Sequence, residues 1–428
     1  IQPLALSAAL SFLMEKQQPP SSPSHKRQRT TSNNSSPTDN NGNTTVAPSL
    51  PLDPGIGLGL ALASELYPHL TQSRLTELTE TARRISTRGK GITACDESSG
   101  TLGGRFEAVG IINSEENRIA YRTMLLDTDG IEEYLCGAIL DVETLLQKSK
   151  ASNKKLFPRA LQDRGIVPGV KPHLKVYTLP GTGGDTVMQG LDSLAVRARQ
   201  YYAAGARFAK WRSPIEIDTA KGRPTELAIG VNMSDLARYA LICQSEGLMP
   251  IVEPDVVLAG THSLAVAVEV NVRVQAELFH AMRKHGVYMA GTTLKPNMVL
   301  PGLECPVSYS VEDIARANAF VMEQCLPAAL TSVNYLSGGQ SLTQALVRLN
   351  AIAQHTRHLP WNTSFSWSKA LQLPLLELCG EKKALCLQEM GCLYIEELKL
   401  ASLASLGTLI DDEYTTINED DNGDHKGV

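Results

Sequence analysis

The chain has 428 residues, a formal net charge of −5 and 20% charged residues. Its basic residues are scattered, so the sequence shows no extended positive surface for nucleic acid, and no uninterrupted apolar stretch is long enough to span a bilayer. One catalytic α/β domain with two polar tails is the simplest organisation for this length.

Residues 1–70 differ in composition from the rest of the chain. They are rich in Ser, Thr, Asn and Pro, with too few large apolar side chains to form a core. We expect a disordered, low-complexity extension. A targeting segment is an alternative interpretation of this extension. The basic cluster at 25–29 is either a solvated charge run or a patch for nuclear import or anion binding. We therefore expect a cytoplasmic protein, or a plastid protein if the extension is a transit segment.

Eight short apolar runs follow, spaced widely enough for a helix between each pair. Each ends in polar or charged side chains, at Asp96, Asp141, Lys171, Lys210 with Arg212, Glu253, Lys295, Ser337 and Lys369. This alternation is typical of βα units, and eight units predict a (β/α)8 TIM barrel over residues 71–405. The strand ends of such a barrel converge on one face, where these charges would become neighbours.

The segments between the runs predict the outer helices. Residues 190–205 and 232–247 have helical apolar spacing, polar starts and a final glycine, and residues 310–325 open with a Ser-x-x-Asp pattern close to a capping box. Residues 406–428 are acidic and polar, so we expect a flexible C-terminal tail.

A lysine at the end of an apolar, β-prone run is the most informative residue. We predict a buried strand over Met289–Leu294, ended by Pro296, which places the Lys295 ammonium at the mouth of the barrel. Burial lowers the pKa of a lysine, and a neutral amine can attack a carbonyl to form a Schiff base. Taken alone, such a lysine is more often a solvated edge residue or half of an ion pair.

The other charges at the predicted mouth suit the same chemistry. Lys210 would lower the pKa of Lys295 further, and Glu253 could move protons while a carbinolamine loses water. Asp96 is then the best-placed base for C–C cleavage. For any one of these residues, a surface ion pair is a better explanation than a catalytic role. For the whole set, a catalytic role is the better explanation.

A candidate phosphate site follows the seventh run. Ser337, Gly338 and Gly339 lie on a predicted strand-to-helix turn, where free backbone N–H groups bind anions. A Gly-Gly pair alone is a weak signal, but phosphate sites of barrel enzymes usually lie at this position.

Several longer motifs carry a resemblance to a known family. They are "GKGITACDESSGTL", "GLDSLAVRARQYYAAGARFAKWR", "PIVEPD", "GTTLKPNM" and "NYLSGGQS", in this order. From about residue 70 to about residue 400 the chain resembles class I, Schiff-base-forming fructose-1,6-bisphosphate aldolase. The resemblance implies a barrel, usually a homotetramer, that cleaves fructose 1,6-bisphosphate to dihydroxyacetone phosphate and glyceraldehyde 3-phosphate without a metal or other cofactor.

The resemblance also implies roles for single residues. Lys295 would form the Schiff base, Glu253 would handle dehydration, Lys210 would be the second active-site lysine, and Asp96 would bind the substrate hydroxyls and assist cleavage. The implied substrate and phosphate contacts are Lys171, Arg212, Ser337, Gly338, Ser98, Arg105 and Lys369.

The chain departs from the family pattern around the phosphates. Gly104 replaces the lysine of a Lys-Arg pair, and Ser368 and Lys369 replace a glycine and an arginine. Lysine keeps the charge but not the planar fork that holds a phosphate by two hydrogen bonds. The tyrosine that usually ends the family's tail has no counterpart at Val428. We predict weaker binding of the second phosphate and a smaller preference for the bisphosphate over fructose 1-phosphate.

Two other readings stay open. A metalloenzyme would use His355 and His358, but their surroundings lack the further ligands that zinc catalysis needs. A non-catalytic scaffold would keep the barrel and lose the chemistry, although the complete set of charged residues argues against it. The eight cysteines form no C-x-x-C pair, and we expect reduced thiols that fill the core.

Overall fold

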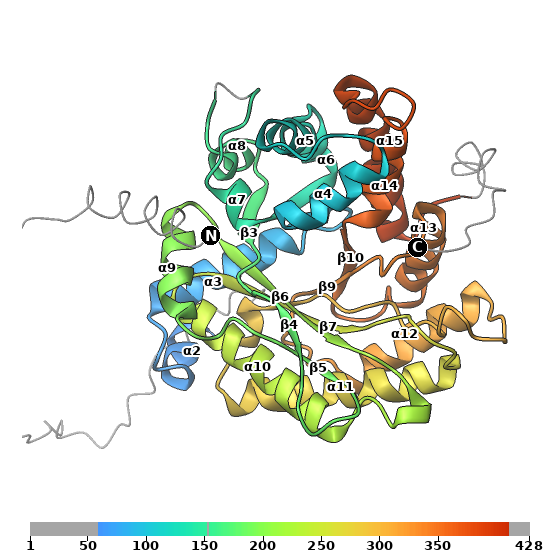
Figure 1. The fold of residues 1–428 in the computed structure, drawn as a ribbon. Coiled ribbons are helices and arrows are strands. Elements are labelled where there is room, and N and C mark those ends of the chain that lie inside the picture. The colour runs from blue at the N-terminus through green and yellow to red at the C-terminus, as the bar shows by residue number, and fades with distance from the viewer. Residues whose placement is uncertain (1–58, 152–153, 411–428) are drawn as a thin grey trace, which may run out of the picture. The chain divides into compact units, whose positions relative to one another are not determined.

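The structure is a computed structural model that describes residues 59–151 and 154–410 (Figure 1). Most of the predicted extension, residues 1–58, and the tail residues 411–428 lie outside the described residues. The predicted boundary near residue 70 falls inside the described part, where a short helix, α2 (Leu60–Leu66), precedes it.

Strands at the centre of the described part form a closed parallel barrel, in the order β1-β10-β9-β8-β7-β6-β3-β2 (Figure 1). Its members are β1 (Gly91–Cys95), β2 (Leu135–Leu140), β3 (Val167–Val170), β6 (Phe208–Ile215), β7 (Met249–Val256), β8 (Thr293–Leu294), β9 (Ser332–Tyr335) and β10 (Asn362–Trp367). The predicted (β/α)8 barrel is confirmed, and each predicted apolar run supplies one strand.

Helices surround the strands. The longer ones are α3 (Gln72–Ile85), α4 (Ser99–Ala108), α5 (Glu115–Asp127), α8 (Phe157–Asp163), α9 (Leu194–Ala203), α10 (Glu226–Ser245), α11 (Leu264–Lys284), α12 (Val311–Cys325), α13 (Leu342–His355), α14 (Lys369–Glu377) and α15 (Leu387–Leu406). The three predicted helices correspond to α9, α10 and α12. In α12 the Ser310 side chain accepts from the Asp313 N–H while the Asp313 side chain accepts from the Ser310 N–H, so the capping box is complete.

The remaining elements are short. They are α6 (Ile131–Tyr134), α7 (Val142–Leu145), the 3₁₀ turns η1 (Thr219–Lys221) and η2 (Met289–Gly291), and a hairpin of β4 (Val176–Thr178) and β5 (Thr186–Met188). No described helix combines the length and the apolar character needed to cross a bilayer.

Glycines leave room for large rings on both sides of the barrel wall. An added Cβ at Gly169 would lie 2.2 Å from the Phe208 ring, which is part of the buried cluster at the end of the barrel opposite the mouth. An added Cβ at Gly91 would lie 2.4 Å from the Phe365 ring, which points outward because its neighbour Ser366 lines the cavity. Both rings are fully buried, and the Phe208 ring helps to fill the barrel below the charged residues.

Two strand predictions are wrong in detail. The predicted strand over Met289–Leu294 is confined to its last two residues, because the buried Gln244 amide donates to the carbonyls of Tyr288 and Gly291 and accepts from the Tyr288 N–H. These side-chain bonds replace the ladder bonds of a strand and favour the turn η2. Strands β6 and β7 also run three residues past Arg212 and Glu253, so these side chains lie within strands and not at their ends.

Candidate active site

The central strands of the barrel fix the positions of the charged side chains. Lys210 and Arg212 are two residues apart on β6, so both point to the same face, and the register sets Arg212 beside Glu253 of β7. Lys295 directly follows β8, and its N–H donates to the Val252 carbonyl at 2.8 Å, which extends the ladder by one bond. The backbone of these residues is therefore held by strand pairing.

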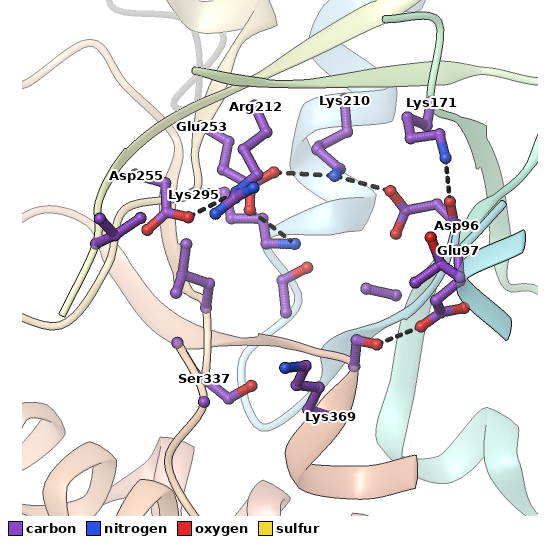
Figure 2. A pocket seen from close by; sticks show the side chains of 18 of the residues that line it. Asp96, Glu97, Lys171, Lys210, Arg212, Glu253, Asp255, Lys295, Ser337 and Lys369 are labelled. Atoms are coloured by element: carbon purple, nitrogen blue, oxygen red, sulfur yellow. Dashed lines mark hydrogen bonds and ion pairs between the residues drawn. The ribbon is translucent and has the colours of Figure 1, made fainter. Parts of the chain in front are cut away.

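A cavity of about 480 Å³ opens among these strand ends (Figure 2). All of the site residues predicted from the sequence line it: Lys295, Glu253, Lys210, Asp96, Lys171, Arg212, Ser337, Gly338, Ser98, Arg105 and Lys369. They come from seven of the barrel strands and the segments that follow them. The structure thus brings together side chains that are up to 273 positions apart in the sequence.

The cluster around Lys295 is an alternating chain of charges. Lys295 Nζ lies 3.4 Å from Glu253 Oε1, Glu253 Oε2 lies 3.0 Å from Lys210 Nζ, and Lys210 Nζ lies 2.8 Å from Asp96 Oδ2. Figure 2 shows Lys210 between the two carboxylates. The side chains of Lys295, Lys210 and Glu253 are each at most 5% exposed, so water screens these charges weakly.

The two lysines titrate in opposite directions. Burial lowers the pKa of Lys295 below its usual value; Glu253 opposes the shift and the positive charge of Lys210 adds to it. Burial also disfavours the charged form of Lys210, but Asp96 and Glu253 together outweigh it and raise the pKa of that ammonium. Lys295 is thus the lysine closer to the neutral state that a nucleophilic amine requires.

The two carboxylates of this chain remain ionised. Burial favours their neutral forms, yet Lys210, Lys171 and Lys295 hold the pKa of Asp96 far below its usual value, and Lys210 and Lys295 lower the pKa of Glu253. Lys171 is anchored beside them because its ammonium donates to the Asp96 carbonyl and lies 3.2 Å from Asp141 Oδ2. Both carboxylates can therefore accept a proton from a bound molecule.

A second group lies across the cavity from the lysine cluster, with Ser337 and Lys369 on that side in Figure 2. Gly338 and Gly339 follow Ser337 with φ of +62° and +84°, a left-handed backbone that favours glycine. Lys369 is the first residue of α14 and is exposed. Since the loops after the seventh and eighth barrel strands meet here, the arrangement suits an anion.

Arg105 is bound within the protein on the same side. Its Nη1 donates to Glu97 Oε1 and to Gln372 Oε1, both at 2.9 Å, and its Nη2 donates to Ser368 Oγ at 3.2 Å. Ser368 Oγ in turn donates to Glu97. Burial opposes the ionised form of Glu97, but Arg122 and Arg105 lower its pKa, and Arg122 Nη1 lies 2.8 Å from Glu97 Oε2.

Ser98 also has an internal contact. It is the N-cap of α4, where its Oγ accepts from the Thr101 N–H at 3.2 Å. Its hydroxyl still faces the cavity with that of Thr101, 3.0 Å away.

The sequence did not predict three titratable residues of the cavity. Glu97 follows Asp96 directly, Asp255 lies two residues after Glu253 on β7, and His173 lies two residues after Lys171. Alternation along the strand would have found Asp255, whose Oδ2 accepts from Arg212 Nε at 2.6 Å. Burial and the nearby lysines hold the pKa of His173 well below its usual value, so the ring is neutral and its Nδ1 accepts from the Arg212 N–H.

The histidines of the metalloenzyme reading lie outside this cavity. His355 Nε2 is 2.8 Å from Glu312 Oε2, and His358 Nε2 is 3.3 Å from Glu323 Oε1. Within residues 59–151 and 154–410, no group of three or more His, Cys, Asp or Glu side chains is arranged to hold a metal ion.

Comparisons with known proteins place this geometry in context. The family model for fructose-bisphosphate aldolase class-I matches residues 77–424. The fructose-bisphosphate aldolase of Dictyostelium discoideum is 42% identical over 340 residues, which cover 79% of this chain and 94% of that protein. Cytosolic fructose-bisphosphate aldolase 4 of Arabidopsis thaliana is 44% identical over 310 residues, covering 72% of this chain and 78% of that protein.

A solved structure is also similar. The fructose-bisphosphate aldolase from Plasmodium falciparum, in complex with TRAP and a small molecule inhibitor, aligns with a TM-score of 0.77 at 39% identity. The alignment covers 80% of this chain and 97% of that chain. The likeness therefore extends over the whole barrel and the strand ends that line the cavity.

Proposed function

The chain belongs to the class-I fructose-bisphosphate aldolase family, and from this premise we propose that Lys295 is the amine that forms the Schiff base. The enzyme cleaves fructose 1,6-bisphosphate reversibly to dihydroxyacetone phosphate and glyceraldehyde 3-phosphate. The observation that carries the assignment is a buried lysine with a lowered pKa, 3.4 Å from a carboxylate at the mouth of the barrel.

The first half of the reaction forms the imine. The neutral amine of Lys295 attacks the ketose carbonyl carbon, and proton transfer gives a carbinolamine. Glu253 takes up the proton that the amine loses and returns it to the departing hydroxyl, which leaves as water. Because Glu253 contacts both lysines, its negative charge also stabilises the iminium that forms on Lys295.

The second half breaks the C–C bond. The iminium withdraws electrons from the adjacent carbon, so the bond between the third and fourth carbons can break once a base removes the proton of the hydroxyl on the fourth carbon. Asp96 is ionised and lies at the far end of the charge chain from Lys295, which suits it to this role. Lys210 holds Asp96 and Glu253 in place and keeps both charged.

The remaining cavity residues bind the substrate. We assign one phosphate to the Ser337–Gly338 turn and to Lys369 at the N-terminus of α14. Ser98 and Arg105 follow β1, with Arg105 bonded to Ser368 at this same end, whereas Lys171 and Arg212 lie with the lysine cluster, where we place the substrate hydroxyls (Figure 2). No cofactor is part of this proposal.

The phosphate end supports a weaker hold on the bisphosphate. Arg105 already donates to Glu97, Gln372 and Ser368, so a phosphate must compete with these acceptors for its N–H groups. Gly104 supplies no second cation, and Lys369 offers a point charge without a planar fork. The ratio of kcat/KM for fructose 1,6-bisphosphate to that for fructose 1-phosphate tests this; a strong preference for the bisphosphate would overturn it.

The function itself is tested by a cleavage assay on the full chain. Purified protein should release dihydroxyacetone phosphate from fructose 1,6-bisphosphate, and Lys295→Met should abolish the release. Lys284→Met is a matched control, because Lys284 ends α11 at the opposite face of the barrel. A folded wild-type protein that releases no product would favour the scaffold reading.

We propose that the chain forms a homo-oligomer, a tetramer, through an exposed apolar surface on the β4–β5 hairpin. Val176 and Tyr177 of β4 and the preceding Leu174 are exposed, and Val196 of α9 is exposed as well. A second copy of the chain would remove them from water. Sedimentation analysis of the wild type and of Tyr177→Asp tests the proposal, since the substitution should lower the association state, and a monomeric wild type would contradict it.

The cytoplasm is the compartment that we propose. The Arabidopsis relative is cytosolic by name. A fluorescent fusion to the full chain, compared with one that starts at residue 59, would separate a cytoplasmic protein from one that residues 1–58 direct to a plastid.

A further inference from the structure

Two cysteines face each other in the turn between α14 and α15. Cys379 Sγ and Cys386 Sγ are 3.0 Å apart, and the Cys386 N–H donates to Cys379 Sγ at 3.4 Å. The Lys383 N–H donates to the Cys379 carbonyl at 2.9 Å, so the backbone of the turn holds the two sulfurs together. Within the described part of the chain, no other two cysteine sulfurs lie within hydrogen-bonding distance.

We propose that Cys379 and Cys386 are a modification site that forms a reversible disulfide. A disulfide bond is about 2.05 Å long, so the sulfurs need to approach by only about 1 Å. A peroxide oxidises one thiol to a sulfenic acid and releases water; the second thiol then displaces hydroxide, which leaves with its proton as a second water, and the S–S bond forms. A dithiol reductant reverses the reaction by exchange.

The surroundings give the two thiols different parts in this reaction. Cys386 is 7% exposed and Cys379 is fully buried, so the oxidant reaches Cys386 first. Burial and the contact with Cys386 raise the pKa of the Cys379 thiol to about 11, so at neutral pH it is mostly protonated and is not the thiol that the oxidant attacks first. The intervening residues 381–384 are exposed, so the turn can adjust as the sulfurs approach.

The two cysteines lie outside the catalytic cavity, but helix α14 connects the two places. Helix α14 starts with Lys369 at the cavity and ends at Glu377, two residues before Cys379, and it packs beside α15 (Figure 1). A disulfide would tie the end of α14 to the start of α15. The loop it closes is short, so the gain in stability should be small, with a rise in Tm of a few degrees.

Peptide mapping of the full-length protein tests the proposal. Trypsin cleaves after Lys382 and Lys383, between the two cysteines, so a disulfide would join the peptides 370–382 and 384–399. The second peptide also contains Cys392, which is exposed, so the experiment uses a Cys392→Ser background. After treatment with hydrogen peroxide, or with oxidised glutathione, we expect the joined peptides, lighter by two hydrogens and separated by dithiothreitol.

Matched variants complete the test. Adding Cys379→Ser or Cys386→Ser to the background should remove the joined peptides and the rise in Tm. Circular dichroism confirms that each variant is folded. The proposal fails if the background protein, oxidised while folded, carries a sulfinic acid or a glutathione on Cys386 while Cys379 still reacts as a free thiol after unfolding.

Discussion

The two ends of the cavity differ in what their charged side chains contact. At one end, positive and negative side chains alternate over contacts of 3.4, 3.0 and 2.8 Å, in the order Lys295, Glu253, Lys210 and Asp96. At the other end, Arg105 donates hydrogen bonds to Glu97, Gln372 and Ser368. In the first group Lys210 keeps two carboxylates charged, so each of them can accept a proton from the substrate. In the second group the protein already occupies the donors that a phosphate needs. The carboxylates of the catalytic end can therefore react with the substrate, whereas the N–H groups of Arg105 at the phosphate end already have acceptors within the protein.

The largest effect should come from neutralising the carboxylate between the lysines. Glu253→Gln keeps the size of the side chain but removes its ability to accept and return a proton, so we expect kcat to fall by about 10²–10⁴-fold. Steady-state kinetics with fructose 1,6-bisphosphate measures the loss.

Asp255→Asn is the control for this change. Asp255 lies on the same strand and is also buried, but it pairs with Arg212. Its loss of kcat should be clearly smaller. Equal losses in the two variants would show that the strand, and not the contact of Glu253 with Lys295, carries the effect.

Removing the second lysine should shift the pH dependence of imine formation. The positive charge of Lys210 lowers the pKa of Lys295, so removing Lys210 raises the pKa of Lys295. Glu253 and Asp96 also lose a cationic partner, so their negative charges act more strongly on Lys295 and raise its pKa further. The amine is free only above its pKa, so the acid limb of kcat/KM should move to higher pH in Lys210→Met.

The size of the shift can be compared with that in Lys171→Met. Lys171 pairs with Asp141 and donates to the Asp96 carbonyl, without a contact to Glu253, so its removal should move the limb less. A downward shift in Lys210→Met would contradict the proposed electrostatic role. We expect kcat to fall by about 10²-fold, because two buried carboxylates lose a partner.

The phosphate end can be rebuilt towards the family pattern. The combined substitutions Gly104→Lys, Ser368→Gly and Lys369→Arg add a cation, free Arg105 from one acceptor and restore the planar fork. An added Cβ at Gly104 meets no atom within 4 Å, so the lysine fits. The ratio of kcat/KM for the bisphosphate to that for fructose 1-phosphate should rise by about tenfold or more, the value of one charge-assisted hydrogen bond.

Lys284→Arg at the opposite end of the barrel is the control for charge type alone. It should leave the ratio unchanged. If the triple variant also leaves it unchanged, Arg105 is available to the phosphate despite its internal contacts, and the contrast between the two ends of the cavity disappears.

The smallest effect concerns stability and a buried glutamate outside the cavity. Glu397 of α15 is fully buried and neither carboxylate oxygen has a hydrogen-bond partner among the described residues, whereas Glu253 contacts two lysines. Burial raises the pKa of Glu397 well above 4.5. The folded state therefore favours the protonated form, and its contribution to stability is present below pH 4.5 and is lost as the pH rises through the raised pKa.

Glu397→Gln should therefore raise the free energy of unfolding at neutral pH, by about 1–3 kcal/mol. The gain should shrink as the pH falls towards 4.5, the usual value for a glutamate. Urea unfolding at several pH values measures it. A destabilised variant at neutral pH would show that the carboxylate has a partner and belongs with Glu253.

The sequence was sufficient for the parts of the fold and site that follow from short-range pattern. Each apolar run followed by a polar or charged residue forms a barrel strand, and barrel geometry alone then brings Asp96, Lys210 and Lys295 to one face. Alternation along β7 would also have found Asp255. These inferences need only strand period and topology.

Other features depend on contacts between distant side chains, which no local pattern specifies. The Gln244 amide favours the turn over Met289–Gly291 through hydrogen bonds to residues that are 44 and 47 positions away. The Glu97–Arg122 pair and the bonds of Ser368 to Arg105 likewise join residues that are separated by 25 and 263 positions. The sequence marked Ser368 and Lys369 as departures, but only the structure shows that Ser368 engages Arg105.

The most direct test of the account is borohydride trapping with dihydroxyacetone phosphate, read by adduct mass and peptide mapping on the wild type, Lys295→Met and Lys210→Met. We expect one reduced adduct on Lys295 in the wild type, no adduct in Lys295→Met, and in Lys210→Met an adduct that still forms on Lys295 but more slowly at neutral pH. An adduct on Lys210, or none on a folded wild-type protein, would contradict the assignment of Lys295 as the nucleophile.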